Sequence, residues 1–465
     1  MVVDFLSYSL IPLFSALAIP FIARKNKRLI ELLSNVTLLS GLLNLSYILL
    51  SYLIKNNYET FTMDVYSFSM IFTIYLVGLS ITFFSTHYGI ENDTNPTSYY
   101  PLILIGVSAM SSIVIAQDIF TLYIFVEALS VVSFALITSD NSHTSIEASI
   151  KYFFLTFPAS VLIIFGISIL LLNHPNLDFS TIKDTSSKFL TIIALSMITV
   201  GFLIKSGIVP FHFWTPDVYQ GAYSPISALL AGIITKIGGV YAIIKIGILI
   251  SNSQLNYFIS KILLLSGILS VLIGAFLAMI QKDFKRMLAY SSISQMGYII
   301  LAVATFTPLG IIAAVFHLIN HATFKTVLFL NSACVEKQTG TTNILELKGL
   351  EHRMPTTAWT SIIAMMATAG IPPLSGFWSK LLIIVALWKN GNIYYAIIAL
   401  IASIITLAYF MILQKKVFFG KLPEKFDGVK EAKFQLLIPV VVISGIIIFS
   451  GLFFDRVYSY LSRIV

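Results

Sequence analysis

AGIPPLSGFWSK, residues 369–380, lies inside an apolar run long enough to cross a membrane, yet it contains residues that interrupt a helix. Pro372 and Pro373 lack the backbone donor that an α-helix needs, and Gly370 precedes them. Lys380 follows the break and places a cation inside the apolar segment. The stretch predicts a broken membrane helix with an ionisable group beside a polar, hydrated gap.

The composition around this stretch is that of a membrane protein. Of the 465 residues, 57% are hydrophobic and 11% are charged, whereas soluble proteins have about 25% charged residues. The single cysteine excludes a disulfide framework and disfavours a thiolate metal site. Because the basic residues behind the net charge of +8 are scattered between apolar spans, the charge indicates no nucleic-acid partner.

A membrane-spanning helix needs about 20 mostly apolar residues. By this measure the sequence predicts an all-α polytopic membrane protein of about fourteen transmembrane helices. The predicted spans lie near 3–23, 29–53, 63–86, 99–116, 119–138, 150–172, 189–210, 224–248, 258–281, 286–306, 308–333, 356–388, 393–415 and 434–454. The longest gap, 334–355, is predicted to be one polar loop, so the helices must supply the function.

The loops between the spans fall into two sets that differ in charge. The basic set is 24–28, 281–286 and 415–433, and the other set is 173–179, 305–310 and 389–392. Short basic loops stay cytoplasmic, so both termini are predicted to lie outside. The acidic loop 87–93 falls on the inner side, a mild exception because Asp and Glu contribute little to this rule.

Several ionisable residues stand alone in the apolar spans. Glu127, Lys205 and Lys236 are each the one charged residue of a different span. Such a group costs a few kcal/mol at bilayer depth, and in a polar interior it often marks an ion or proton path. Each residue by itself is equally explained by a pairing that holds the bundle together. It is their number that favours a path for protons.

Three more ionisable residues share one face of a single span. His317, His321 and Lys325 follow at intervals of four, which places each about 40° around the helix from the last. A lone histidine is more often a packing residue than a relay. Lysine suits proton transfer because a buried ammonium group can both take up and release a proton. An acid such as Glu127 beside a lysine would hold that lysine charged.

A second span is interrupted as well. In KSGIVPFHFWTPDVYQGAYSP (205–225), Pro210 follows Lys205. Two broken spans in corresponding places of two halves indicate an inverted-repeat transporter. The segments 99–248 and 258–415 each hold five spans with the broken one fourth, and an odd number inverts the second copy. Ordinary proline kinks remain the alternative.

Three long stretches resemble one known family. They are 205–246, from KSGIVPF to YAIIKI, then KRMLAYSSISQMGY (285–298), and 317–350, from HLINHATFK to LELKGL. They resemble the antiporter-like membrane subunits of respiratory complex I, of the N, M and L type. The same family includes the D-type subunits of Mrp sodium/proton antiporters and subunits of membrane-bound energy-converting hydrogenases. The resemblance is strongest over about 100–385.

The resemblance implies a fold and a set of site residues. The fold has fourteen helices in two inverted five-helix repeats, each a half-channel, with helices 7 and 12 broken at Pro210 and at Pro372 and Pro373. A polar axis through the membrane centre joins the half-channels. Its residues would be Glu127 on helix 5, Lys205 on helix 7, Lys236 on helix 8, His317, His321 and Lys325 on helix 11, and Lys380 on helix 12.

The implied divisions of the chain follow this fold. They are 1–98, three N-terminal helices; 99–248, the first repeat; 249–415, the second repeat; and 416–465, a cytoplasmic loop and the last helix. No long lateral helix follows the last span, which disfavours the longest of the complex I types.

The expected function is that of a proton-translocating subunit of a multisubunit energy-converting oxidoreductase, like complex I or a membrane-bound hydrogenase. The alternative is a subunit of an Mrp-type cation/proton antiporter without a redox partner. A non-conducting scaffold is a third possibility, which the intact set of costly charges disfavours. The sequence leaves open whether protons or sodium ions move.

The chain itself is expected to hold no cofactor, no metal and no catalytic redox site, because it lacks a CxxC pair, a cysteine cluster and a Gly-rich nucleotide loop. Expected partners are further antiporter-like subunits, small hydrophobic subunits and peripheral redox subunits. The expected location is the cell membrane of a prokaryote.

Overall fold

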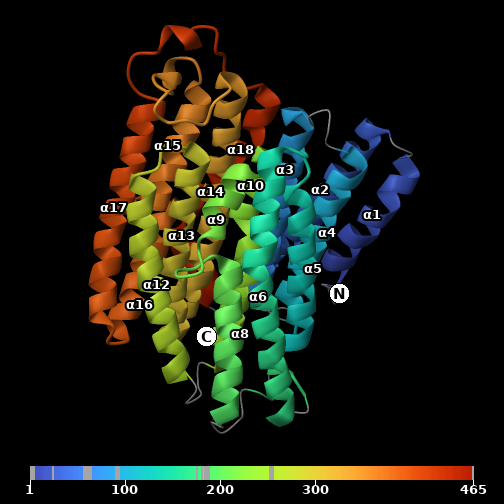
Figure 1. Cartoon of the computed structure of the whole chain (residues 1–465), viewed down its shortest axis with the longest axis vertical. Coiled ribbons are helices and arrows are strands. Elements are labelled where there is room, and N and C mark those ends of the chain that lie inside the picture. The colour runs from blue at the N-terminus through green and yellow to red at the C-terminus, as the bar shows by residue number, and fades with distance from the viewer. Residues whose placement is uncertain are drawn as a thin grey trace.

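The computed structural model describes residues 6–23, 26–55, 65–89, 95–173, 176–179, 182, 189–250 and 256–462. Over these residues the chain is helical, and the β-type pairings are two isolated bridges, Asp118 with Asp178 and Asp283 with Asn343. Most of the helices run side by side along the long axis of the molecule (Figure 1).

The order of the helical elements is α1 (Ser7–Ala23), α2 (Lys27–Lys55), α3 (Val65–Tyr88), α4 (Pro96–Ile115), α5 (Ile119–Ile137), α6 (His143–Asn173), α8 (Phe189–Ser206), α9 (Trp214–Gly221), α10 (Ser224–Leu229), η2 (Leu230–Ile234), η3 (Lys236–Tyr241), α11 (Ala242–Ile250), α12 (Asn256–Met279), α13 (Phe284–Val303), α14 (Pro308–Thr339), η4 (Leu350–His352), α15 (Pro355–Ala369), α16 (Ser375–Lys389), α17 (Ile393–Val417), η5 (Glu424–Phe426), α18 (Phe434–Leu452) and α19 (Phe454–Leu461). Of these, η2 and η3 are π-helical and η4 and η5 are 3₁₀ turns.

Eleven helices of the described residues are long and apolar enough to cross a membrane. The chain is therefore a multi-span helical membrane protein. The remaining predicted spans also coincide with helices. One is α1 with 17 residues, another is α13 with its many polar side chains, and 356–388 is divided into α15 and α16. Helices thus occupy every predicted span.

Two predicted boundaries are wrong. The polar loop expected over 334–355 begins later, because α14 continues to Thr339 and ends at Gly340 in the left-handed conformation. The span expected from 150 begins at His143. Both errors have one cause, since a hydropathy window excludes polar turns at helix ends even when they continue the helix.

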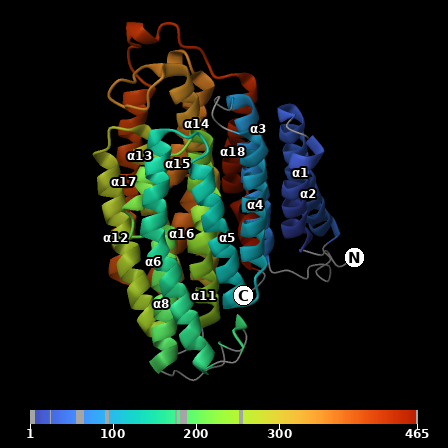
Figure 2. The same cartoon turned by 45° about the vertical axis from the view of Figure 1, so that its right-hand side comes forward.

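The centre of the molecule is α14. Every residue from 310 to 335 except Ile319 is buried, because α14 packs against α3, α10, α13, α15, α16 and α18. In contrast, α1 and α2 lie at one side of the bundle, where they pack against α3 and α4 (Figures 1 and 2). Polar groups on α14 between residues 310 and 335 are thus shielded by the neighbouring helices.

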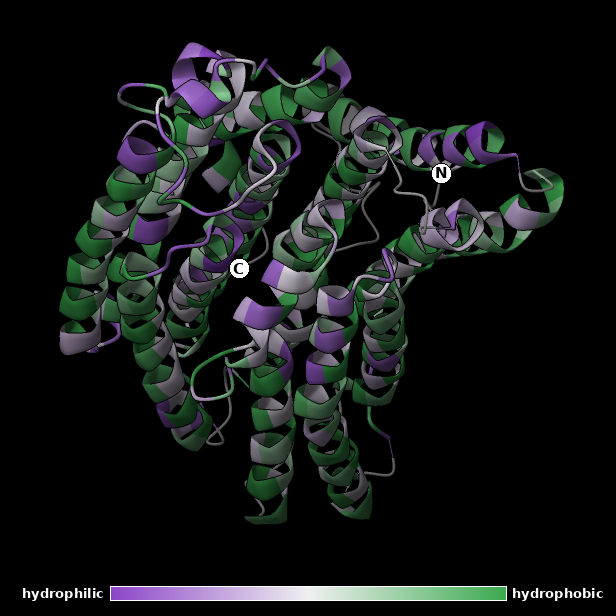
Figure 3. Ribbon diagram, turned by 45° about the horizontal axis from the view of Figure 1, so that its top comes forward, coloured by the Kyte–Doolittle hydropathy of each residue, from purple (hydrophilic) through white to green (hydrophobic). Residues whose placement is uncertain are grey.

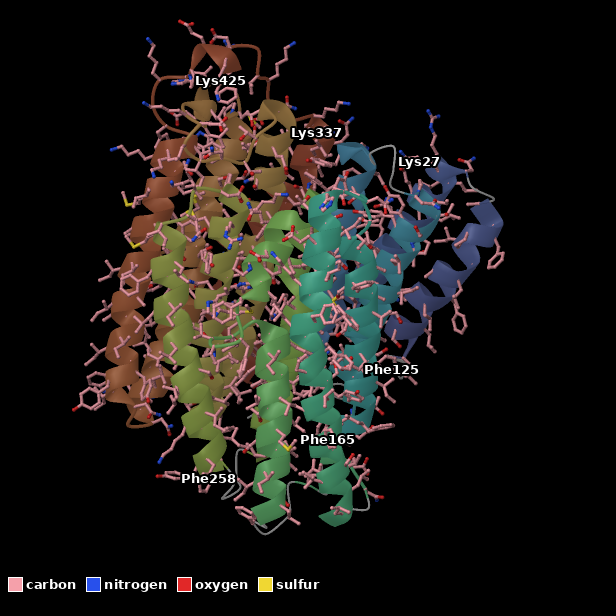
Figure 4. All side chains as sticks on the ribbon, in the orientation of Figure 1. Lys27, Phe125, Phe165, Phe258, Lys337 and Lys425 are labelled. Atoms are coloured by element: carbon pink, nitrogen blue, oxygen red, sulfur yellow. The ribbon has the colours of Figure 1, made fainter. Side chains whose placement is uncertain are left out.

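The two ends of the bundle differ in charge. Lys27, Lys337 and Lys425 lie at one end, and Phe165 and Phe258 lie at the other (Figure 4). Hydropathy colouring shows that the outer helices are mostly apolar along their length (Figure 3). The basic loops 281–286 and 415–433 meet at the end of Lys425 through the 343–346 turn, since Lys282 O accepts from Ile344 N and Lys425 Nζ lies 3.2 Å from Glu346. Residues 24–25, 90–94 and 174–175 of the other predicted loops fall outside the described residues.

Both predicted helix breaks are present. The first is the segment 207–213 between α8 and α9, which contains Pro210, and the second is 370–374 between α15 and α16, which contains Pro372 and Pro373. Each begins with a glycine in the left-handed region, Gly207 and Gly370, which a residue with a Cβ seldom adopts.

Candidate functional site

Glu127 on α5 and Lys205 on α8 form a direct ion pair. The Lys205 ammonium lies 3.1 Å from Glu127 Oε1 and donates to Ser130 Oγ at 2.9 Å. Ser160 on α6 donates to the other Glu127 oxygen at 2.9 Å. The pair joins three helices, as expected of an acid placed to hold a neighbouring lysine charged.

A pocket of about 490 Å³ contains this ion pair. Its walls include Phe153, Phe154 and Phe157 of α6, all exposed on the outer side of the bundle. The Glu127 side chain is 29% exposed, whereas that of Lys205 is 6% exposed. Both side chains therefore line the pocket, and the acid is the more exposed of the two.

Lys236 lies in a stretch of π-helix that continues from α10. It begins the π-helical segment η3, and π-helical turns often occur at functional sites. Its ammonium donates to Tyr219 OH and to Thr235 Oγ1, both at 2.9 Å. The side chain is buried, and none of the ion pairs among the described residues includes it.

The three predicted site residues of α14 are buried and hydrogen-bonded to neutral groups. His321 Nε2 lies 3.2 Å from Ser292 Oγ on α13, and Lys325 donates to Ser291 Oγ at 2.7 Å. His317 contacts a different helix, α16, because its Nδ1 lies 2.8 Å from Ser379 Oγ. The spacing of four along the helix thus spreads the three groups over two partner helices.

Lys380 lies against the second helix break. Its ammonium is 3.4 Å from Ala369 O, a carbonyl at the end of α15, and 3.2 Å from Ser403 Oγ on α17. Ser403 also donates to Ala369 O at 2.9 Å. The break thus supplies an oxygen that a continuous helix would have used internally, and the buried lysine binds it.

The predicted residues form a series with one direct contact. Glu127 and Lys205 touch, while the remaining groups are separated by neutral side chains. His321 is near enough to Lys236, Lys325 and His317 to interact with them electrostatically. Lys380 is similarly close to His317 and Lys325. The series runs from the pocket on α5 and α6 across the centre to the break before α16.

Sequence reasoning missed the neutral partners of this series. Hydroxyl side chains are common in membrane helices, so their presence alone does not mark these partners. Their role depends on which helix packs against them. They are Tyr219, Thr235, Ser291 and Ser292. One signal was present, because YSSISQ (290–295) is unusually polar for a predicted span. That polarity alone does not indicate which helix the hydroxyl groups face.

A polar pocket of about 550 Å³ at the end that carries Lys337 was also missed. On its wall Lys285 lies 3.4 Å from Glu336 and donates to Ser224 Oγ at 2.8 Å. Ser224 begins the helix that leads to Lys236. The pocket therefore lies over the end of that helix.

The described residues contain no group of three or more His, Cys, Asp or Glu side chains that could hold a metal ion. Cys334 is buried on α14. What the site offers chemically is a succession of proton donors and acceptors.

A family profile, described as NADH:quinone oxidoreductase/Mrp antiporter, TM, matches residues 116–406. This chain belongs to that family. The match spans Glu127, Lys205, Lys236 and Lys380 together with both helix breaks.

Curated relatives include subunits of a Na(+)/H(+) antiporter and of an NADH-quinone oxidoreductase. The chain is 30% identical to the D subunit of the Na(+)/H(+) antiporter of Alkalihalophilus pseudofirmus, over 85% of this chain and 81% of that protein. It is 32% identical to the N subunit of the NADH-quinone oxidoreductase of Thioalkalivibrio sulfidiphilus, over 78% of this chain and 77% of that protein.

Solved structures show the same fold. A chain of the Mrp complex from a Dietzia species superposes with a TM-score of 0.89 at 23% identity, over 99% of this chain and 96% of that chain. A chain of the archaeal membrane-bound sulfane sulfur reductase, a respiratory membrane complex, superposes with a TM-score of 0.87 at 25% identity, over 98% and 96%.

Proposed function

We propose that this chain is a proton-translocating, antiporter-like membrane subunit of a multisubunit energy-converting oxidoreductase. The observation that carries the proposal is the buried series from Glu127 through Lys205, Lys236, His321 and Lys325 to Lys380. Its members after the Glu127–Lys205 ion pair bind neutral groups. Such groups can exchange protons without carrying a permanent countercharge.

The proton step begins at the Glu127–Lys205 pair. While Glu127 is ionised, its carboxylate stabilises the Lys205 ammonium at 3.1 Å. When Glu127 takes up a proton from the pocket that it faces, this stabilisation is lost. Lys205 then passes its own proton inward to the next neutral acceptor, so one proton enters the series as one moves on.

The polar pocket at the basic end provides the second access in this proposal. Lys285 and Glu336 lie on its wall, and Ser224 connects it to the helix of Lys236. Protons would reach Lys236 from this side through Tyr219 and Thr235, which contact its ammonium.

Two inverted five-helix repeats within a fourteen-helix fold are part of the proposal. The first comprises 99–248 and the second 249–415, between the flanking parts 1–98 and 416–465. The two β-bridges support this, because Asp118 caps α5 and pairs with Asp178 while Asp283 caps α13 and pairs with Asn343. Each bridge thus joins the start of the second helix of a repeat to the loop before its broken helix.

The proposed orientation places the end with Lys425 in the cytoplasm and both termini outside a prokaryotic cell membrane. The basic loops at that end support it. Redox cofactors would be bound by peripheral partner subunits, and the membrane partners would be further antiporter-like and small hydrophobic subunits.

A second candidate is a subunit of an Mrp-type cation/proton antiporter. The 30% identity to the D subunit of a Na(+)/H(+) antiporter, over 85% of this chain, supports it. The two candidates share the proton series and differ in what drives it.

Purification of the tagged chain from its native membrane in mild detergent, followed by mass spectrometry, tests the choice. Co-purifying iron–sulfur, flavin or nickel subunits support the oxidoreductase, and pumping with a redox substrate is then measured. Only small hydrophobic partners would contradict it in favour of the antiporter, which is tested by sodium-dependent proton flux.

A further inference from the structure

The last two lysines of the series have separate partners and do not meet. Lys325 donates to Ser291 Oγ at 2.7 Å. Lys380 donates to Ser403 Oγ at 3.2 Å and lies 4.6 Å from the ring centroid of Tyr298. Ser291 and Tyr298 both belong to α13. Ser291 and Tyr298 are seven positions apart, about 10 Å along the helix axis, and this stretch of α13 separates the contacts of the two lysines.

Gln295 lies between Ser291 and Tyr298 on α13. It follows Ser291 by four residues and precedes Tyr298 by three, and these spacings place all three side chains on one face of α13. That face meets both α14 and α17. On the α14 side, Ser291 binds Lys325 and the Tyr298 ring lies 6.1 Å from the His317 ring. On the α17 side, the Tyr298 hydroxyl donates to Ala399 O at 2.7 Å.

The amide of Gln295 has unused hydrogen-bonding capacity. The residue is buried with 0% exposure, and neither its oxygen nor its nitrogen has a protein hydrogen-bond partner of normal geometry. Tyr409, which donates to Ser291 at 3.0 Å, is near enough to interact with the amide. An unsatisfied buried amide costs free energy, so a further partner is required.

Two more unsatisfied atoms belong to the facing helix. His317 Nε2 and His321 Nδ1 on α14 are buried without a partner, while the other nitrogen of each ring binds a serine. Buried polar groups without protein partners are characteristically hydrogen-bonded to internal water. The atoms that need a further partner therefore lie on both of these packed helices, α13 and α14.

We propose that Gln295 is a positioning residue that holds bridging water between Lys325 and Lys380. An amide both donates and accepts, so it orients a water chain in either direction without binding the proton itself. This inference rests on the proposed function and adds a residue and a ligand to it. It places the link along α13 and parallel to the histidines of α14.

The test compares variants of the intact complex in proteoliposomes. Gln295→Leu removes both amide atoms and is expected to lower proton transport about tenfold or more, while Gln295→His restores most of it. Gln414→Leu is the control, because Gln414 is also buried with both amide atoms unpartnered and lies near the end of α17. Its transport is expected to stay within about twofold of the unmodified complex.

A high-resolution map of the same complex provides a second readout. Water density about 2.7–3.2 Å from the Gln295 amide that disappears in Gln295→Leu supports the inference, and no such density overturns it. Should Gln295→Leu fail to assemble, an assembled Gln295→His variant decides. Its transport supports the link and its inactivity contradicts it.

The variant Lys325→Met distinguishes a failure of the Gln295 inference from a failure of the proposed function. If Lys325→Met stops transport while Gln295→Leu transports normally, the role of Gln295 is wrong and the proton series stands. If Lys325→Met also transports normally, the proposed function itself is wrong.

Discussion

At the scale of single residues, the site consists of buried charges with few countercharges. Lys236, Lys325 and Lys380 bind hydroxyls and carbonyl oxygens, whereas Lys205 binds a carboxylate. In the proposed function, this difference makes Lys205 the starting point of a transfer and the other lysines its receivers.

Glu127→Ala or Lys205→Ala is expected to abolish proton transport and leave assembly nearly intact. Removing Glu127 would leave the buried Lys205 ammonium unpaired, at a cost of about 3–5 kcal/mol, and the proposed transfer would lose the group that takes up its proton. Flux into proteoliposomes is the measurement.

Glu147→Ala is the control for this pair. Glu147 also forms an ion pair with a lysine, Lys151, at 2.7 Å, but its side chain is 59% exposed. Exposed pairs contribute little, so transport is expected to stay unchanged. Normal transport by either Glu127→Ala or Lys205→Ala would show that the pair is not part of the path.

At position 380, the presence of a titratable group is expected to matter more than the sign of its charge. Lys380→Glu should retain more transport than Lys380→Ala, because a carboxyl group can still exchange protons beside Ser403 and Ala369 O. Initial rates of proton flux measure this. Equal loss in both variants would rule out proton exchange at this side chain.

At the scale of elements, the two helix breaks make backbone groups available to the side chains of the site. The break before α16 exposes Ala369 O, to which both Ser403 and Lys380 donate. The break after α8 is closely packed, because Gly239 leaves no space for a Cβ against Ser206. Proline interrupts the helix, and glycine allows neighbouring groups to approach.

Gly370→Ala is expected to lower both stability and transport. Its φ of +86° disfavours any residue with a Cβ, at a cost of about 1–2 kcal/mol. The new Cβ would also lie 3.1 Å from Lys380 Cδ and displace that side chain. Thermal unfolding of the detergent-purified complex and proton flux are measured together.

Gly391→Ala is the control that separates the effect of backbone strain from the effect of the contact with Lys380. Gly391 has a similar φ of +78°, but a Cβ there meets nothing within 4 Å. It should lower stability by a similar amount and leave transport unchanged. If Gly370→Ala left transport unchanged, as is expected for Gly391→Ala, the contact of the new Cβ with Lys380 would have no effect on transport.

At the scale of the whole molecule, the difference in charge between the two ends of the bundle predicts its orientation in the membrane. The helix α17 has 25 residues, about 37 Å at 1.5 Å per residue, which exceeds the hydrocarbon core of about 30 Å. Asn390 just before it and Lys425 just after it therefore lie on opposite sides of the membrane.

Cysteine labelling checks the direction. Cys334 is the one cysteine in the sequence and is buried, so new cysteines can be labelled without removing it. An impermeant maleimide is expected to label Asn390→Cys in intact cells and Lys425→Cys only in inverted vesicles. The reverse pattern would place the basic loops outside.

The sequence by itself determined which segments are helical, where two of them break and which charges are buried in them. Hydropathy is a property of contiguous residues, so apolar runs, prolines and isolated charges can be identified before packing is known. For the same reason it misplaced the end of α14 at residue 333 rather than Thr339, because polar turns at a helix end resemble a loop.

Only the tertiary structure decided which groups meet. The 3.1 Å contact between Glu127 and Lys205, the serines beside His321 and Lys325, and the position of Gln295 between two lysines all depend on how helices are rotated against one another. A helix such as α14 is buried on every side, so its sequence has no apolar stripe to indicate which face meets which neighbour. The partners of its polar residues are therefore set by packing between segments distant in sequence.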